Sequence, residues 1–212
     1  MSALETAFAA VITVVSAAGL ILTSHILEGW DKVRWQMFRF YTSLSNAAVF
    51  LTHVLLLFPG PAREVLRSPR GRYILTLCIL VTFLVYFFVL TRFGRIDDRT
   101  LKALGMQRLS NVIVHYLVPG LTVLEWLTAA DKRGLGLGDA LVWLLVPLCY
   151  LLLCIWRAAA GAVIGATGRR WPYDFMDLDK LGLSRWIASM LLTLAGFFAL
   201  GLLLLGVSAL YQ

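Results

Sequence analysis

The sequence predicts an all-α integral membrane protein, a bundle of six transmembrane helices forming a single domain over residues 1–212. The first observation is composition: 60% of the 212 residues are hydrophobic and 15% are charged, whereas soluble domains carry about a quarter charged residues. The second is a set of six apolar stretches, each close to the roughly 20 residues that a helix needs to cross a hydrocarbon core. Helices are expected because lipid offers no hydrogen-bond partner to backbone N–H and C=O groups, and a helix pairs them internally.

The six predicted spans follow one another closely and leave no room for a separate soluble domain. They cover residues 4–27, 40–58, 73–91, 109–127, 141–156 and 186–210. The first should stay in the mature chain. No basic residue precedes its apolar run, Glu5 lies near its start, and the run is longer than the apolar run of about 7–15 residues in a signal peptide. Cys78, Cys149 and Cys154 fall inside spans, where a small apolar role is expected, and no metal or cofactor spacing is visible.

The positive charge fits a membrane protein better than a nucleic-acid-binding one. The formal net charge is +7, but the Lys and Arg residues sit in short connections between spans. Connections one, three and five hold thirteen of the 19, and connections two and four hold six, Arg72 among them. The positive-inside rule then predicts cytoplasmic odd-numbered connections and outward termini in a multi-pass membrane protein.

The connections differ in character. The second, with Pro59-Gly60-Pro61, and the fourth, with Gly134, Gly136 and Gly138, are typical tight turns. The fifth, residues 157–185, contains a stretch at 171–182 in which aromatic and acidic residues mingle. Aromatic rings settle at membrane interfaces, so this stretch is expected to be an interfacial anchor or a lid over a site.

Two polar stripes are the most informative feature, because polar groups inside a span normally face the bundle. The second span carries Thr42, Ser45, Asn46 and His53, and the fourth carries Asn111, His115, Thr122 and Glu125. Each set falls on one helical face at 3.6 residues per turn. Pro119 lacks an N–H and leaves the carbonyl of His115 without its helical partner, which predicts a kink or a polar pocket there.

Depth in the membrane pairs one residue from each stripe. Thr42 and His115 both lie near the membrane face that carries the odd-numbered connections, whereas His53 lies eleven residues from Thr42, about 16 Å along a helix. His115 is therefore the candidate base for the Thr42 hydroxyl if the two helices are neighbours. One acid of the fifth connection is a candidate to orient the imidazole: Asp174, Asp177 or Asp179. The alternatives without a catalytic role are a hydrogen bond from the Thr42 hydroxyl to a carbonyl of its own helix and a structural hydrogen bond at His115.

Three blocks of this sequence resemble the androgen-induced membrane protein family, in its six-helix bacterial branch. The stretch 38–46 is similar to the aromatic-Thr-x-x-Ser-Asn motif of that family's second helix. The stretch 111–119 is similar to its fourth-helix His block, and 171–182 to the signature of its penultimate loop. The order and spacing of the blocks cover most of the chain.

The resemblance implies an intramembrane threonine hydrolase of fatty acid esters of hydroxy fatty acids or a related lipid ester, with Thr42 as nucleophile and His115 as base. It also implies a lipid substrate from the bilayer, no cofactor and, through the bacterial branch, a place in a bacterial inner membrane. Candidate oxyanion or supporting groups are Asn46, Asn111 and Ser45.

Two rival functions belong to other classes. A small transporter or channel would use Glu125 and the polar stripes to line a path, with Pro119 and Pro147 as helix breaks. A haem-binding redox subunit would need level pairs among His25, His53 and His115, which lie at different depths.

Overall fold

The computed structural model describes residues 1–91, 108–164 and 168–211, and within these ranges it contains no β-strand beyond one isolated bridge between Ile164 and Arg169. The chain divides into two compact units, Met1–Lys132 and Arg133–Gln212. The prediction of an all-helical protein is confirmed for the described residues.

The first unit begins with α1 (Ala3–Ser24), which starts where Ser2 and Glu5 form a capping box and ends where His25 adopts a left-handed conformation with φ 59°. Three short 3₁₀ helices follow: η1 (Ile26–Glu28), η2 (Trp30–Lys32) and η3 (Trp35–Arg39). The chain then bends by 102° into α2 (Tyr41–Leu57). This bend places Thr42 in the first turn of a buried helix.

Two of the remaining helices of the first unit contain a π-helical segment. After α3 (Pro61–Arg67), α4 (Pro69–Leu84) starts at a proline that suits a first helical turn and continues as the π-helical η4 (Val85–Leu90). A second continuous helix comprises α6 (Arg108–Val112), the π-helical η5 (Ile113–Leu117) and α7 (Val118–Thr128). The distortion that Pro119 predicts is therefore present, as a wider helical turn that contains His115.

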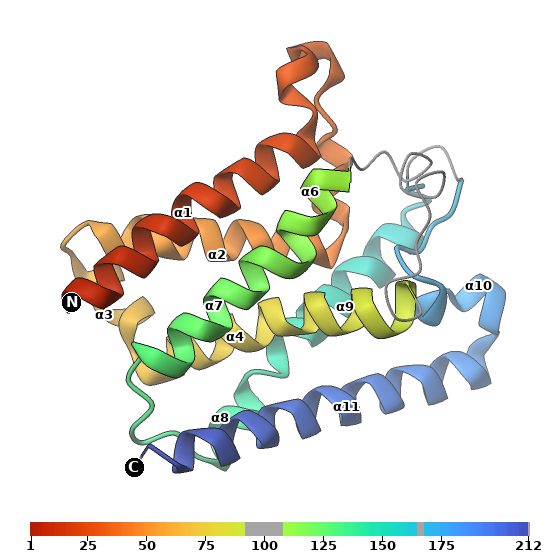
Figure 1. The fold of residues 1–212 in the computed structure, drawn as a ribbon. Helices are drawn as coiled ribbons and strands as arrows, with labels where there is room; N and C mark the ends of the chain where they lie inside the picture. The colour runs from red at the N-terminus through yellow and green to blue at the C-terminus, as the bar shows by residue number, and fades with distance from the viewer. Residues whose placement is uncertain (92–107, 165–167, 212) are drawn as a thin grey trace. The chain divides into compact units, whose positions relative to one another are not determined.

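Helices α1, α2, α4 and α6–α7 lie side by side (Figure 1) and share one apolar core. Its buried members are Ile12, Val49, Leu75, Ile79, Ile113 and Val118. Gly19 lets α1 approach η5 closely, because a Cβ there would lie 2.8 Å from Ile113 Cγ2 and 2.9 Å from Val114 Cγ1. The helical turn that carries His115 is thus held directly against α1.

The second unit consists of α8 (Leu137–Val142), α9 (Leu145–Ala159), η7 (Asp174–Met176), α10 (Leu178–Leu181) and α11 (Leu183–Ala209). Pro147 has no N–H to continue a ladder, and α8 and α9 are separated just before it, at Trp143 and Leu144. The buried Trp143 indole donates to the carbonyl of Phe197 at 3.2 Å and so joins this break to α11.

Each of the six predicted apolar stretches contains helix. Four helices are long and apolar enough to cross a membrane: Ala3–Ser24, Pro69–Leu90, Leu137–Ala159 and Leu183–Ala209. The bent pair Trp30–Arg39 and Tyr41–Leu57 would make a fifth. Helix Arg108–Thr128 is not among these candidates, so six crossings stay a prediction. The placement of Arg72 in a connection was wrong: it lies within α4 and is buried.

Candidate functional site

Within the part of the chain that the structure describes, the Thr42 hydroxyl makes no hydrogen bond, although threonine hydroxyls in helices usually bond to a backbone carbonyl. Thr13, Thr76 and Thr122 each donate to the carbonyl four residues earlier, at 2.7, 2.8 and 2.9 Å. Thr42 occupies the first turn of α2, where the fourth preceding residue lies outside the helix. The back-bonded alternative for Thr42 is therefore absent, and its partly buried hydroxyl is left for other chemistry.

Asn46 ties the start of α2 to the helix that carries His115. Its side-chain nitrogen donates to the carbonyl of Thr42 at 2.8 Å and to the carbonyl of Val114 at 3.1 Å. Because one atom contacts both carbonyls, these two oxygens lie no farther apart than the two bond lengths together. The residue before the predicted base is thus beside the backbone of the predicted nucleophile.

Ser45 extends the same cluster to α4. Its hydroxyl lies 2.6 Å from the Thr82 hydroxyl and 3.0 Å from the Thr42 carbonyl. Ser45 and Thr82 are both buried. Three helices therefore contribute polar groups to one small region inside the apolar unit.

His115 lies on one π-helical turn and stacks on Tyr86 of the other, with ring centroids 3.8 Å apart and planes inclined by 18°. Asn111, one turn before His115, donates to the Tyr86 hydroxyl. Nδ1 of His115 is buried and has no hydrogen-bond partner among the residues that the structure describes. This nitrogen is therefore available to a proton or to a substrate group, and π-helical turns are frequent at functional sites.

The structure brings together five sequence-predicted residues: Thr42, Ser45, Asn46, Asn111 and His115. No hydrogen bond joins the Thr42 hydroxyl to the His115 imidazole. Catalytic hydrogen bonds are often long in enzymes without substrate and tighten when substrate binds. Asn46, Asn111 and Ser45 already bond within the cluster, so an oxyanion role for them stays a prediction.

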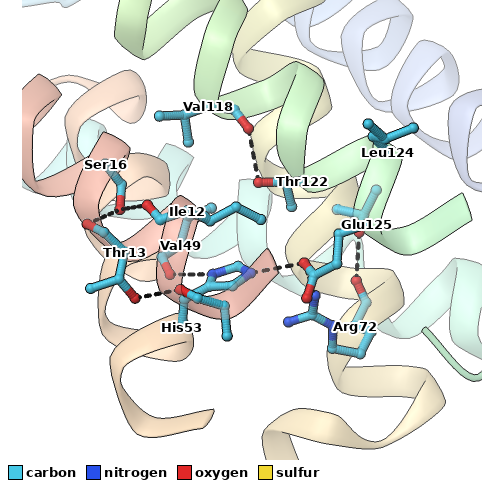
Figure 2. Close-up of polar contacts among 12 residues, drawn as sticks. Ile12, Thr13, Ser16, Val49, His53, Arg72, Val118, Thr122, Leu124 and Glu125 are labelled. Carbon is cyan, nitrogen blue, oxygen red and sulfur yellow. Dashed lines mark hydrogen bonds and ion pairs between the residues drawn. The ribbon is translucent and has the colours of Figure 1, made fainter. Parts of the chain in front are cut away.

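A second buried polar cluster joins α2, α4 and α7 (Figure 2). Nδ1 of His53 lies 2.7 Å from the carbonyl of Val49, and Nε2 lies 2.9 Å from Oε2 of Glu125. The guanidinium of Arg72 forms an ion pair with the same carboxylate. All three charged or titratable side chains are almost inaccessible to solvent. Both nitrogens of the His53 ring are engaged, which argues against haem ligation there.

The three acids of the fifth connection have partners inside their own segment. Asp174 pairs with Arg169 at 2.5 Å and Lys180 at 2.9 Å, and Asp177 caps α10 by accepting from the backbone N–H of Lys180. The hydrogen bond from the Lys180 ammonium, with the Arg169 guanidinium nearby, holds the pKa of the Asp174 carboxyl below its ordinary value. Orientation of His115 by one of these acids stays a prediction.

Asp179 and two tryptophans build the rest of this segment. Asp179 accepts from Nε of Arg170 at 3.0 Å and from the Trp171 indole at 3.2 Å. Trp186 donates to the Met176 carbonyl at 2.9 Å. The aromatic and acidic stretch is thus fastened to the beginning of α11, as an anchor would be.

Sequence reasoning missed three members of these clusters: Thr82, Tyr86 and Arg72. Thr82 and Tyr86 lie in the third predicted span, which holds three threonines and two tyrosines and no charged residue, so neither of them stood out. Arg72 directly precedes an apolar run that contains no acid. Its partner Glu125 was the available signal, because a buried carboxylate in a membrane helix demands a cation from a neighbour.

Metal binding has no evident site: no three His, Cys, Asp or Glu side chains form such a group in the part of the chain that the structure describes. Comparisons of the chain with protein-family models, with curated proteins and with solved structures gave no match.

Proposed function

We propose that this protein is an intramembrane hydrolase of lipid esters with six spans, in which Thr42 is the nucleophile and His115 the general base. The bridging side chain of Asn46 carries the proposal, because it brings the helical turns of these two residues together. The Thr42 hydroxyl, for which no hydrogen bond to a described residue is seen, and the unpartnered Nδ1 of His115 add to it. A nucleophile and a base must both have unsatisfied capacity before substrate arrives.

The reaction would proceed in two balanced halves. The Thr42 oxygen attacks the ester carbonyl carbon while His115 takes the hydroxyl proton; the ester C–O bond then breaks and the leaving alcohol takes that proton. Water next attacks the acyl-threonine, again losing its proton to His115, which returns it to the Thr42 oxygen as the fatty acid leaves. No cofactor is needed for either half.

Negative charge on the tetrahedral intermediate would be met at the start of α2. The first amide groups of a helix lack intrahelical acceptors, and no side chain caps this end. The N–H groups of Thr42 and Ser43 are therefore our candidates for oxyanion donors, with the helix dipole in support. Asn46 and Asn111 would then hold the helices in place instead of contacting the oxyanion.

The substrate class follows from the surroundings. The cluster lies between helices whose other faces expose large apolar side chains such as Val14, Leu51 and Leu117. A substrate that enters from such surroundings must be apolar, and the free hydroxyl and imidazole act on its ester bond. We propose a long-chain lipid ester taken from the bilayer of a bacterial inner membrane, with the odd-numbered connections on the cytoplasmic side.

Hydrolysis of a long-chain fluorogenic ester by the detergent-purified protein tests the proposal. Wild type should release the alcohol, Thr42→Ala should lose about a thousandfold in rate, and Thr42→Ser should retain activity because it keeps the hydroxyl. Thr13→Ala is the matched control, since that hydroxyl is back-bonded outside the cluster. Equal rates for wild type and Thr42→Ala, both well folded, would contradict the proposal.

A small proton-coupled transporter is the second candidate, and the buried His53, Glu125 and Arg72 favour it. Ionisable residues inside membrane helices commonly mark ion or proton pathways. Uptake into proteoliposomes that survives Thr42→Ala and stops with Glu125→Gln would favour this candidate over the hydrolase.

A further inference from the structure

In the second polar cluster, the two contacts of the His53 ring need more protons than His53 and Glu125 carry in their usual ionisation states. A carbonyl oxygen can only accept, so the 2.7 Å contact between Nδ1 of His53 and the carbonyl of Val49 requires a proton on Nδ1. A neutral imidazole that carries its proton on Nδ1 has only a lone pair on Nε2. That nitrogen faces Oε2 of Glu125 at 2.9 Å.

An ionised carboxylate is also acceptor-only, and two acceptors do not bond. The contact at Nε2 therefore needs one further proton. It belongs either to an imidazolium beside a carboxylate or to a carboxylic acid beside a neutral imidazole. In both descriptions the His53–Glu125 pair holds one proton more than a free His and Glu hold together at neutral pH.

We propose that His53 and Glu125 form a binding site for one proton, which latches α2 to α7 inside the bundle. With the proton bound, Nε2 and Oε2 share a hydrogen bond between the two helices (Figure 2). Without it, the one remaining ring proton can serve either the Val49 carbonyl or the Glu125 carboxylate but not both, so one of these two contacts becomes a pair of facing lone pairs. The site is independent of any chemistry at Thr42.

The charges around the site come from each neighbouring element. Arg72 on α4 pairs with Glu125, so the cluster carries a net charge of one positive unit when the proton is bound and none when it has left. Glu5 on α1 pairs with Arg67 on α3 at 3.0 Å, and these two charges cancel. Beyond α7, the ammonium of Lys132 donates to the carbonyls of Leu127 and Ala130, and Asp131 lies close enough to interact with Arg67.

A route for the proton starts from the end of the unit where α1 begins. A pocket with room for about one water molecule lies against Arg72 and Glu125 and is also lined by Met1, Glu5 and Arg67. Nη1 of Arg72 is buried and has no hydrogen-bond partner, so it can hold such a water. Exchange would therefore pass over Glu125 and not through the Thr42 cluster.

Nuclear magnetic resonance of the full-length protein, labelled with ¹⁵N-histidine in detergent micelles, tests the proton directly. The variants His25→Gln and His115→Gln assign the three rings, and Glu125→Gln assigns the infrared band of the Glu125 carboxyl. At about pH 8, above the ordinary His value of about 6.5, we expect one of two results. Either both His53 nitrogens carry protons, or Glu125 absorbs as a carboxylic acid. A His53 ring with only one protonated nitrogen, whichever nitrogen that is, together with an ionised Glu125 would overturn the proposal.

The variant His53→Gln separates the latch from simple packing. Its amide N–H can donate to the Glu125 carboxylate without any extra proton. Wild type should lose thermal stability as pH rises above about 6.5, because the folded state holds a proton that the unfolded chain releases. His53→Gln should lack that dependence, and His25→Gln should keep it. Retention of the wild-type pH dependence in His53→Gln would overturn the latch, and if this variant does not fold, the wild-type spectra decide.

Discussion

The two polar clusters of the first unit lie in the same four helices and yet differ in how their groups are satisfied. Among the described residues, neither the Thr42 hydroxyl nor Nδ1 of His115 has a hydrogen-bond partner. At His53, the ring nitrogens both have partners, and Glu125 also pairs with Arg72. A polar group without a hydrogen bond in an apolar interior costs free energy. Such a group therefore often marks a functional site. We therefore assign chemistry to the first cluster and a charge-based latch to the second.

Replacing each of the two histidines by alanine in turn should separate the roles of the two clusters most clearly. His115→Ala should lower ester hydrolysis by roughly a thousandfold, since the base is lost, and should lower the thermal midpoint less than His53→Ala, because it removes the stacking on Tyr86 but leaves no buried carboxylate without its partner. His53→Ala should do the reverse. Parallel measurements of hydrolysis rate and thermal unfolding check both; similar behaviour of the two variants would contradict the division of roles.

The second largest effect concerns the ion pair. Glu125→Leu leaves the buried Arg72 guanidinium without a counter-charge and should destabilise the protein by about 3–5 kcal/mol. The double variant Glu125→Leu with Arg72→Leu should recover much of this loss, because no charge is then left unpaired. Thermal unfolding in detergent measures both. A single variant as stable as wild type would show that the pair contributes little.

A smaller effect is expected where α1 supports the His115 turn. Gly19→Ala would place a methyl group 2.8 Å from Ile113 Cγ2 and should destabilise by about 1–3 kcal/mol through overpacking. It should also lower hydrolysis, since the η5 turn would shift. Gly120→Ala and Gly196→Ala, whose added Cβ meets nothing within 4 Å, are the matched controls. Equal effects at all three glycines would refute a special role for Gly19.

The smallest effect is expected in the fifth connection. Because the pKa of Asp174 is held below its ordinary value, its ion pairs stabilise this segment above about pH 4 and are lost as pH falls through the folded-state value. Asp174 is more than half exposed, so the contribution should stay below about 1 kcal/mol. Asp174→Asn should remove the acid transition in Trp171 and Trp186 fluorescence. An unchanged transition would assign it to another group.

Much of the fold could be predicted from the sequence because lipid-compatible helices need long apolar runs, and such runs are visible by eye. The two polar stripes were equally visible, since 3.6-residue spacing gathers Asn46 with His53 and Asn111 with His115. What spacing does not give is the neighbour across a helix interface. The link from Ser45 to Thr82 and the stacking of Tyr86 on His115 depend on helix packing.

Arg72 is a second residue whose partner could not be predicted from spacing along the sequence. It directly precedes an apolar run, and a basic residue in that place normally marks a connection at the membrane surface. The start of α4 at Pro69 moves it inside the helix, next to the carboxylate of Glu125. A buried acid in one predicted span therefore deserves a search for a cation near the ends of the others.

The most direct test of the central proposal is covalent labelling of the Thr42 hydroxyl. The detergent-purified wild type should react with a fluorophosphonate probe, and mass mapping should place the adduct on Thr42; Thr42→Ala and His115→Ala should not react, and Thr13→Ala should react like wild type. A folded wild type that takes up no probe, or an adduct at another residue, would contradict an activated threonine and favour the transporter.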